Sequence, residues 1–391
     1  MKSKKHLAII STHPIQYNAP LFKLLSNQPY FTIKVFYTRG QTESEVFDKD
    51  FGQSVEWDIP LLEEYDFTFV KNISSPPETA RFNGIINPTL NKEILDWRPD
   101  ALLVFGWSYS SHLKAIRYFY NKIPVFFRGD STLIDETLTF SFKKIIRRLF
   151  LTWVYRHINF ALYVGSANKA YFLAHGLKFH QLLFAPHAVD NHRFADPAGI
   201  DSNKAKAWKN SLGIKENERV FLFAGKLTKK KNPELLIKSF LALPQNWKLV
   251  IAGSGELENE LKQKYESCSS IIFIGFQNQS KMPVVYRLGD VFILPSQGPG
   301  ETWGLAINEA MACGKAVIVS DKCGCSADLV VNDKNGYVFE HDKQESLEKC
   351  MRLVMKNYKE QGIYSQQLIS NWSYAATVDQ IDRTLRQFFG E

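Results

Sequence analysis

The chain has 391 residues, which is too long for one hydrophobic core and makes two domains the default expectation. Hydrophobic residues make up 45% and charged residues 23%, which are ordinary globular values, and no apolar stretch approaches the roughly 18 residues that span a bilayer. The formal net charge of +8 favours an anionic partner such as phosphate, nucleic acid or anionic lipid.

The first half of the sequence alternates short apolar runs with helix-sized amphipathic segments. We expect strands at residues 7–10, 33–37, 101–105, 124–127 and 160–164. This alternation is typical of βαβ units around a parallel sheet. The apolar run at 7–10 is too short for a signal peptide, so we expect a cytoplasmic protein.

One helix, expected over residues 140–157, lies in a zone without acidic residues between Glu136 and Asp190. In helical projection one face carries the apolar residues Phe142, Ile146, Leu149, Phe150 and Trp153. Another face carries the basic residues Lys143, Lys144, Arg147 and Arg148. Two interpretations stay open: a core-packing helix with a solvated basic back, or a helix on an anionic membrane surface.

A polar stretch at 196–210 interrupts the alternation and is the expected domain junction. Further strands are expected at residues 220–224, 248–252, 271–274, 291–294 and 316–319, and a helix at 374–389. We therefore predict an N-terminal α/β domain over 1–195, a second over 196–372, and a C-terminal helix over 373–391 that can pack back on the N-terminal domain. The five cysteines lie in the second half without a CxxC pair, which indicates reduced thiols.

The expected strand at 291–294 leads into a glycine-rich loop and a helix that Gly314 can end. Such a loop presents backbone N–H groups to an anion, so we predict a phosphate site here. Glu301 lies in the loop and Glu309 about a turn inside the helix, so both can face one ligand. Alternatively, Glu301 interacts with the helix dipole and Glu309 is a solvated helix residue.

The segment Glu301-Thr-Trp-Gly-Leu-Ala-Ile-Asn-Glu309 resembles the E-x7-E motif of glycosyltransferase family four. Four further stretches resemble that family in the right order: 185–194, 223–234, 249–256 and 274–296. The resemblance covers roughly residues 185–340. It implies the GT-B architecture, in which two Rossmann-like domains face each other across a cleft, and sugar transfer with retention of the anomeric configuration.

The resemblance assigns Lys226 and Lys231 to the diphosphate of a nucleotide-sugar donor. Fixed cations and helix N–H groups can stabilise the charge of a departing diphosphate, so neither a metal nor a cofactor is expected. Lysine stands at 226 where the family usually has arginine, which removes bidentate hydrogen bonding. A solvated basic turn is the alternative for 229–231.

The resemblance also places Glu301 on the sugar hydroxyls and Glu309 on the ribose. Backbone amides near Trp303, Gly304 and Leu305 would surround the phosphates. Thr302 and Trp303 replace the family's commoner Gly-Phe pair and would make a bulkier wall beside the sugar. Phe276 is a candidate neighbour of the nucleobase or, alternatively, a core aromatic.

The N-terminal half departs from the family at two places. Its first loop has no glycine but offers His13, Gln16 and Tyr17. Arg128 or Asp130 stands roughly where the family has a histidine, and either is a candidate for contact with the acceptor or the sugar. A turn between strand and helix is the alternative. The stretch 106–112 can join the same site, although His112 fits a helix face better.

We therefore expect a retaining glycosyltransferase that acts on a glycan or lipid-linked glycan in cell-surface polysaccharide biosynthesis. A GT-B phosphorylase or a sugar-nucleotide epimerase is the nearest alternative. A non-catalytic basic protein that binds membrane or nucleic acid is an alternative of another class. The DxD pattern Asp48-Lys-Asp50 would indicate the metal-dependent glycosyltransferase architecture, which the second-half motifs contradict.

Overall fold

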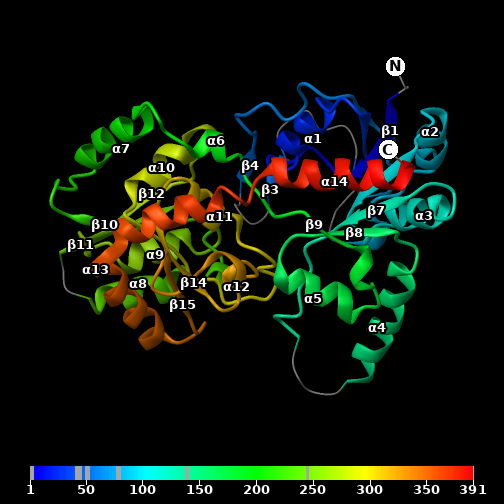
Figure 1. Cartoon of the computed structure of the whole chain (residues 1–391). Helices are drawn as coiled ribbons and strands as arrows, with labels where there is room; N and C mark the ends of the chain where they lie inside the picture. The colour runs from blue at the N-terminus through cyan, green and yellow to red at the C-terminus, as the bar shows by residue number, and fades with distance from the viewer. Residues whose placement is uncertain are drawn as a thin grey trace. The chain divides into compact units, whose positions relative to one another are not determined.

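The computed structural model describes residues 4–39, 46–48, 53–75, 81–136, 141–243 and 246–390. The chain divides into two compact units, each an α/β domain around a parallel sheet (Figure 1). The first unit comprises Met1–Ser44, Pro60–Pro186 and Tyr374–Glu391. The second comprises Glu45–Ile59 and His187–Ser373.

The first unit contains a seven-stranded sheet in the order β5-β2-β1-β6-β7-β8-β9, and all neighbouring strands in it are parallel. Its strands are β1 (Lys5–Ser11), β2 (Phe31–Tyr37), β5 (Phe67–Phe69), β6 (Ala101–Phe105), β7 (Val125–Arg128), β8 (Phe160–Tyr163) and β9 (Leu182–Phe184). Its helices are α1 (Ala19–Ser26), α2 (Leu90–Asp96), α3 (Ser110–Phe119), α4 (Phe142–Tyr155), α5 (Ser166–Ala174) and α14 (Tyr374–Phe389), with the 3-10 turns η1 (Phe82–Gly84) and η2 (Phe179–Gln181).

The second unit contains a six-stranded parallel sheet in the order β12-β11-β10-β13-β14-β15. Its strands are β10 (Arg219–Ala224), β11 (Trp247–Ala252), β12 (Ile271–Gly275), β13 (Val291–Leu294), β14 (Ala316–Ser320) and β15 (Gly336–Phe339). Its helices are α6 (Asn191–Phe194), α7 (Ile200–Ser211), α8 (Pro233–Leu241), α9 (Glu258–Lys264), α10 (Met282–Leu288), α11 (Leu305–Ala312), α12 (Ser326–Leu329) and α13 (Gln344–Ile369), with the 3-10 turns η3 (Lys229–Lys231) and η4 (Gln279–Lys281). β3 (Val46–Asp48) and β4 (Gln53–Val55) pair antiparallel as a separate ribbon.

The central strands of both sheets are buried along nearly their whole length. In the first unit, residues 7–11 of β1 are all buried, and in the second unit all four residues of β13 are buried. Helices cover both faces of such parallel sheets, so their strands are apolar runs rather than alternating patterns. Each of the ten predicted strands overlaps an observed one, which confirms the parallel α/β prediction.

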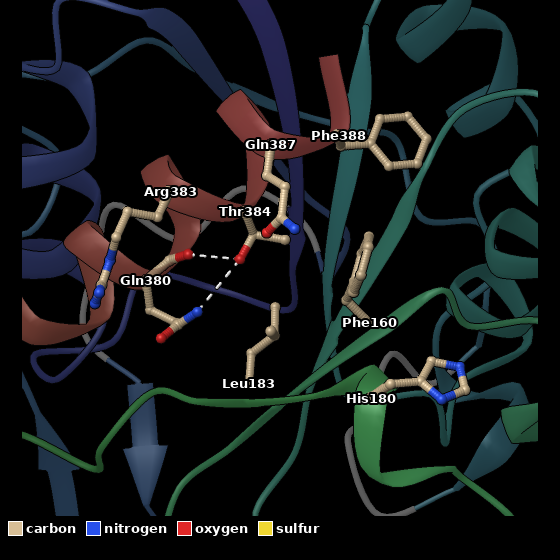
Figure 2. A pocket seen from close by; sticks show the side chains of 8 residues that line it. All are labelled: Phe160, His180, Leu183, Gln380, Arg383, Thr384, Gln387 and Phe388. Carbon is tan, nitrogen blue, oxygen red and sulfur yellow. Dashed lines mark hydrogen bonds between the residues drawn. The ribbon is translucent and has the colours of Figure 1, made fainter. Parts of the chain in front are cut away.

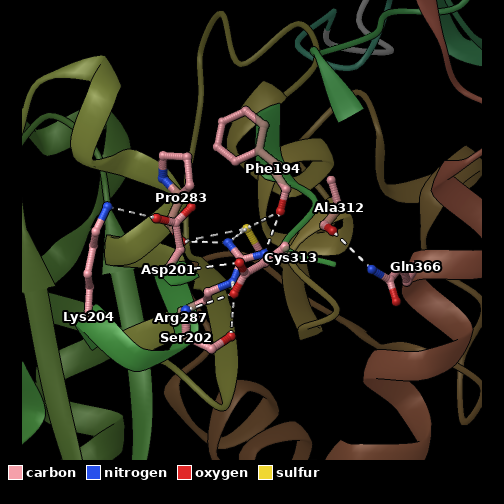
Figure 3. A network of polar contacts seen from close by, with 10 residues as sticks. Phe194, Asp201, Ser202, Lys204, Pro283, Arg287, Ala312, Cys313 and Gln366 are labelled. Carbon is pink, nitrogen blue, oxygen red and sulfur yellow. Dashed lines mark hydrogen bonds and ion pairs between the residues drawn. The ribbon is translucent and has the colours of Figure 1, made fainter. Parts of the chain in front are cut away.

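The predicted domain junction at 196–210 is wrong, because residues 200–211 form helix α7 of the second unit. Asp196 accepts hydrogen bonds from the amides of Asp201 and Ser202 and forms an ion pair with Arg287 of α10 at 3.4 Å. Figure 3 shows Arg287 within this network, where it also donates to the carbonyl oxygen of Phe194 at 2.6 Å. These contacts attach residues 187–195 to the second unit, so the compact units divide at Pro186/His187 and not at residue 195.

The C-terminal helix α14 belongs to the first unit. It packs against α1 and buries Val378, Ile381 and Leu385, which recur at helical spacing. The Arg386 guanidinium also lies over the ring of Tyr30, 4.5 Å from its centroid. The helix thus completes the packing of the first unit after the chain has passed through the second.

Candidate donor site

The order of the six-stranded sheet reverses between β10 and β13. From β10 the chain moves outward to β11 and β12, and from β13 it moves to β14 and β15 on the other side. In open α/β sheets, ligands bind beyond the carboxyl ends of the strands at such a switch point. The segments that follow β10 and β13 contain Lys226, Lys231 and Glu301, so the topology brings these predicted residues to one edge of the sheet.

Direct contacts join the two segments. The Lys230 ammonium donates to the carbonyl oxygen of Gly300 at 2.7 Å. Gln297 donates through its amide to the carbonyl oxygen of Lys230 at 2.9 Å and through its side chain to that of Lys229 at 2.7 Å. The turn η3 is therefore bound to the glycine-rich loop, which argues against a merely solvated basic turn at 229–231.

Lys231 and Glu301 form the central ion pair of this edge. Lys231 Nζ lies 2.6 Å from Glu301 Oε2, and Ser296 Oγ donates to the same oxygen at 3.0 Å. Glu301 is only 8% exposed. Burial alone would raise the pKa of Glu301, but the charge and hydrogen bond of Lys231, the charge of Lys230 and the Ser296 hydroxyl together hold it below its usual value. The site thus keeps a buried carboxylate ionised beside a lysine.

Two glycines allow the loop to close on the start of α11. Gly304 precedes the helix with φ +103°, a left-handed conformation that other residues rarely adopt. A Cβ on Gly324 would lie 1.7 Å from the carbonyl oxygen of Thr302, so only glycine fits there. The Gly324 and Cys325 amides donate to the carbonyl oxygens of Glu301 and Trp303, both at 3.0 Å. Leu305 then opens the helix, and the first amides of a helix have no partner within it.

Glu309 lies inside α11 and is 2% exposed. Tyr286 of α10 donates a hydrogen bond from its hydroxyl to Glu309 Oε2 at 2.6 Å. The alternative of a solvated helix residue is therefore wrong. Contact of Glu309 with a ribose stays a prediction, and it requires the ligand to reach a carboxylate that α10 and α11 enclose.

Trp303 does not form the predicted wall with its side chain, which is 3% exposed. The indole Nε1 donates to Asn308 Oδ1 at 2.8 Å, and the ring packs against His187 and Trp372 with centroids 5.6 and 5.3 Å away. Asn308 in turn donates to the carbonyl oxygen of His187 at 2.9 Å. Trp303 is therefore a core residue, and its packing holds the glycine-rich loop in place. Its neighbour Thr302 is half-buried.

Lys226 and Phe276 are half-buried residues that follow β10 and β12. A Cβ on Gly253, after β11, would lie 1.9 Å from the carbonyl oxygen of Gly225, so the turn after β11 packs tightly beside Lys226. Phe276 follows the outermost strand of the sheet, two strands from β10. Both therefore lie at the edge that carries Lys231 and Glu301.

The first unit has its own switch point, between β1 and β6. The predicted acceptor-side residues His13, Gln16 and Tyr17 follow β1 and are all half-buried. Burial, with a smaller effect of the Arg39 charge, lowers the pKa of His13 to about 4. His13 is therefore neutral near pH 7, with one ring nitrogen that donates a hydrogen bond and one that accepts.

Arg128 has structural partners, and contact with an acceptor stays a prediction. Its guanidinium is buried and donates to the carbonyl oxygens of Ala185 at 2.9 Å and Pro186 at 3.1 Å, just before the chain enters the second unit. Burial lowers the pKa of Arg128 to about 10, against the opposing charge of Asp130. Asp130 itself is half-buried beyond the end of β7, and its contact with a ligand stays a prediction.

His112 is fully buried in α3. Its Nδ1 faces the carbonyl oxygen of Gly106 at 2.9 Å and its Nε2 faces the Thr38 hydroxyl at 2.7 Å. A carbonyl only accepts, so Nδ1 carries the proton and Nε2 accepts from Thr38. Burial lowers the pKa of His112 to about 4. It is a structural residue, as the sequence favoured.

Helix α4 exposes the apolar face that the sequence singled out. Phe142 is 71%, Ile146 53% and Leu149 66% exposed, whereas Leu151, Val154 and Tyr155 are the helix residues that enter the core. The interpretation of α4 as a core-packing helix is therefore wrong for its first two turns, whose apolar side chains are exposed. Trp153 is half-buried, under the guanidinium of Arg117.

The remaining sequence features have plain structural outcomes. All five cysteines are free thiols, and burial raises the pKa of Cys313 and of Cys323 to about 12. In the described ranges, no group of three or more His, Cys, Asp and Glu residues could hold a metal ion, and no helix is long and apolar enough to cross a membrane. Within Asp48-Lys-Asp50, the last two residues lie outside the described residues.

Sequence reasoning missed Ser296, Lys230 and Tyr286, each of which contacts a predicted site residue or its loop. Ser296 and Lys230 stood inside quoted segments, at a strand end and in a lysine run, but nothing marked them individually. Tyr286 had no signal, since its contact with Glu309 depends on how α10 packs beside α11.

Comparison with known proteins adds to this geometry. Residues 204–371 match the family model "Glycosyl transferases group 1". A UDP-Gal:alpha-D-GlcNAc-diphosphoundecaprenol alpha-1,3-galactosyltransferase from Escherichia coli is 29% identical over 214 residues, which cover 50% of this chain and 51% of that protein. A lipopolysaccharide 1,2-N-acetylglucosaminetransferase from Salmonella typhimurium is 28% identical over 196 residues, which cover 42% and 51%. The chain thus spans about half the length of these curated relatives.

Solved structures match over nearly the whole chain. A sucrose-phosphate synthase from Thermosynechococcus elongatus superposes with a TM-score of 0.73 at 15% identity and covers 99% of this chain and 100% of its own. The Anabaena protein Alr3699/HepE in complex with UDP gives 0.71 at 16% identity, with coverages of 98% and 100%. With two parallel-sheet α/β units, the fold is GT-B, as the sequence resemblance implied.

Proposed function

We propose that this chain is a retaining glycosyltransferase that moves a sugar from a nucleotide-sugar donor to a glycan or lipid-linked glycan. The pair of half-buried Lys231 and buried Glu301 at the switch point of the second sheet carries the proposal. It lies within the residues that match the group 1 glycosyltransferase model. The relatives described above are named for sugar transfer, and one protein of this fold, Alr3699/HepE, has solved structures named as complexes with UDP and with UDP-glucose.

In the proposed reaction, the main task of the donor site is to stabilise negative charge on the leaving group. A departing nucleoside diphosphate gains negative charge, and Lys226, Lys231 and the first amides of α11 can stabilise it without a metal. Glu301 orients Lys231 and accepts hydrogen bonds from the donor sugar. For retention, the leaving phosphate takes the acceptor's proton on the face from which it departs. Asp130 and His13 of the first unit are the residues that contact the acceptor or the sugar.

The test uses release of nucleoside diphosphate by the full chain from a panel of UDP-, GDP- and dTDP-sugars. We expect Lys231→Met or Glu301→Gln to lower release at least about tenfold, because each removes one half of a buried charge pair. The exposed pair Lys264–Glu234, also 2.6 Å long, supplies matched controls in Lys264→Met and Glu234→Gln. Equal rates in site and control variants would overturn the proposal.

Two further measurements separate the alternatives. A phosphorylase would need inorganic phosphate for turnover, and an epimerase would change the sugar without releasing diphosphate. Release that stops with EDTA and returns with Mn²⁺ would contradict the metal-free mechanism.

We also propose that α4 rests on an anionic membrane surface, on the cytoplasmic side of the cell. Exposed Phe142, Ile146 and Leu149 alternate along the helix with Lys143, Lys144, Arg147 and Arg148. Apolar side chains of this kind insert at the boundary of headgroups and acyl chains, while basic side chains bind anionic lipids. Of the basic residues, Arg147 also pairs with Glu136 at 3.2 Å. A lipid-linked acceptor, as in the name of the E. coli relative, would be met at such a surface.

Vesicle sedimentation tests this contact. Vesicles of equal parts phosphatidylglycerol and phosphatidylcholine should bind the chain, and pure phosphatidylcholine should bind it weakly. Leu149→Asn and Arg148→Glu should each reduce binding several-fold. Ile363→Asn changes a similarly exposed apolar residue on α13 and should not. Unchanged vesicle binding in Leu149→Asn and Arg148→Glu would contradict a membrane contact through α4.

A further inference from the structure

A cavity of about 460 Å³ lies in the first unit between α14 and the segments around β8 and β9. Figure 2 shows side chains of α14 on one side of it and Phe160, His180 and Leu183 on the other. Phe160 begins β8, so the cavity lies at the amino ends of these strands. The residues after β1 and β7 lie at the opposite, carboxyl ends, and the cavity therefore does not belong to the acceptor-side residues.

The α14 side of the cavity is polar. The helix buries Val378, Ile381 and Leu385, and the adjoining row of Gln380, Arg383, Thr384 and Gln387 faces the cavity. Thr384 donates to the carbonyl oxygen of Gln380 at 2.8 Å, which fixes the middle of the row. Thr384 is buried beside the apolar stripe, whereas Arg383 and Gln387 are exposed, so packing of the helix does not use these two side chains.

Gln380 donates from its side chain to Thr384 Oγ1 at 3.3 Å, which leaves its amide oxygen and the groups of Arg383, His180 and Gln387 for a ligand. The structure gives Arg383 one hydrogen bond, from Nε to the carbonyl oxygen of Asp379 at 3.3 Å, and no ion pair with a described carboxylate. Across the described residues, neither His180 nor Gln387 makes a side-chain hydrogen bond. The residues that line the cavity include two basic groups and no carboxylate.

Apolar contact comes from both sides of the cavity, since Phe388 belongs to α14 and Phe160 and Leu183 lie opposite it. Phe388 is 50% exposed and stands edge-on to Phe160, with ring centroids 6.2 Å apart. Leu183 completes this surface. Aromatic rings pack well against the C–H face of a sugar ring, and carboxamides pair with its hydroxyls. Arginine adds a bidentate partner for a carboxylate. The volume falls within the range of about 300–1,000 Å³ that small-molecule sites occupy.

We propose that this cavity binds an acidic saccharide unit, namely a uronate-containing segment of the glycan. Arg383 holds the carboxylate, Gln380 and Gln387 hold hydroxyls, and Phe160 and Phe388 contact the ring. The choice of a saccharide rests on the proposed function, because an enzyme that extends a glycan meets that polymer away from its reacting end. The site then retains the polymer between transfers.

Isothermal titration calorimetry on the full chain tests the proposal with two probes of equal length. Trigalacturonate should bind, and maltotriose, which lacks carboxylates, should bind at least about fivefold more weakly. Arg383→Ala and Gln387→Ala should each raise the Kd for trigalacturonate at least about fivefold. Lys204→Ala, on α7 in the second unit, is the control and should leave the Kd unchanged.

The proposal is overturned by equal binding of the two trisaccharides, by no binding of either, or by an unchanged Kd in both α14 variants. Tighter binding of uridine monophosphate than of trigalacturonate, lost in Arg383→Ala, would also overturn it and assign the cavity to a nucleotide. Diphosphate release, which depends on Lys231 and Glu301, is measured separately. Failure of the saccharide site therefore leaves the transferase proposal standing.

Discussion

Lys231 and Glu301 stand 70 residues apart in the sequence, yet Nζ of one lies 2.6 Å from Oε2 of the other at the switch point of the second sheet. The pair is shielded, with side-chain exposures of 18% and 9%. Removal of Lys231 leaves the buried Glu301 carboxylate without its cation, at roughly 3 kcal/mol. Both stability and activity therefore depend on the same contact.

The first prediction is a double-mutant cycle on this pair. Lys231→Met and Glu301→Gln should each slow diphosphate release at least about tenfold, and the double variant should lose less than the product of the two factors. The second change removes a group whose partner has already gone. Steady-state release rates provide the test. Factors that multiply would show that the two residues act independently.

Tyr286 is expected to position Glu309. Tyr286→Phe removes the 2.6 Å hydrogen bond to Glu309 Oε2 and keeps the ring packed between Phe194 and Phe292. If Glu309 binds the ribose, the KM for the nucleotide sugar should rise about threefold to tenfold while kcat changes little, because a typical hydrogen bond contributes about 1 kcal/mol. Glu309→Gln should act in the same direction. A fall in kcat alone in both variants would contradict ribose binding.

Substitution of Trp303 is expected to change the free energy of unfolding more than the activity. Trp303→Ala should lower the free energy of unfolding by roughly 3–5 kcal/mol, as for other large buried side chains. Trp303→Phe retains the contacts with His187 and Trp372 but loses the hydrogen bond to Asn308, so it should cost about 1 kcal/mol. Urea unfolding measures both. A stable Trp303→Ala variant with altered sugar preference would restore the wall interpretation.

The strands follow from local sequence, because long apolar runs mark buried parallel strands and glycines mark the loops. The strand order and the Lys231–Glu301 contact were not predicted, since they join residues far apart in the chain. The short strands β5, β9 and β15 lack such runs and were not predicted. The side-chain directions of Trp303 and Arg128 were not predicted, for a different reason. Sequence gives the position of a residue along a loop or strand, but the direction of its side chain depends on distant partners such as Trp372 and Pro186.

Acid should destabilise the first unit through His112. Its pKa of about 4 lies below the ordinary value of 6.5. Between these two pH values the unfolded chain therefore binds a proton at His112 that the folded chain does not bind. Stability is therefore complete above about pH 6.5 and falls as the pH drops from 6.5 towards 4. His13 acts in the same direction. His112→Gln should unfold more easily at pH 7 but show a smaller decrease between pH 7 and 5, by urea titration. If the free energy of unfolding changed with pH equally in the unmodified chain and in His112→Gln, His112 would not be the source of the acid sensitivity.

Arg128 should hold the end of the first unit without touching the donor. Arg128→Met removes the donor to the buried carbonyl oxygen of Ala185 and one of two donors to that of Pro186, which should cost roughly 3 kcal/mol. Thr377 also donates to the Pro186 oxygen at 3.4 Å, so Thr377→Val should cost about 1 kcal/mol in the same direction. Because both variants share that oxygen, their combined cost should differ from the sum. Urea unfolding supplies these values, and the KM for the nucleotide sugar should stay constant in both. A raised KM in Arg128→Met with unchanged stability would return Arg128 to the ligand site.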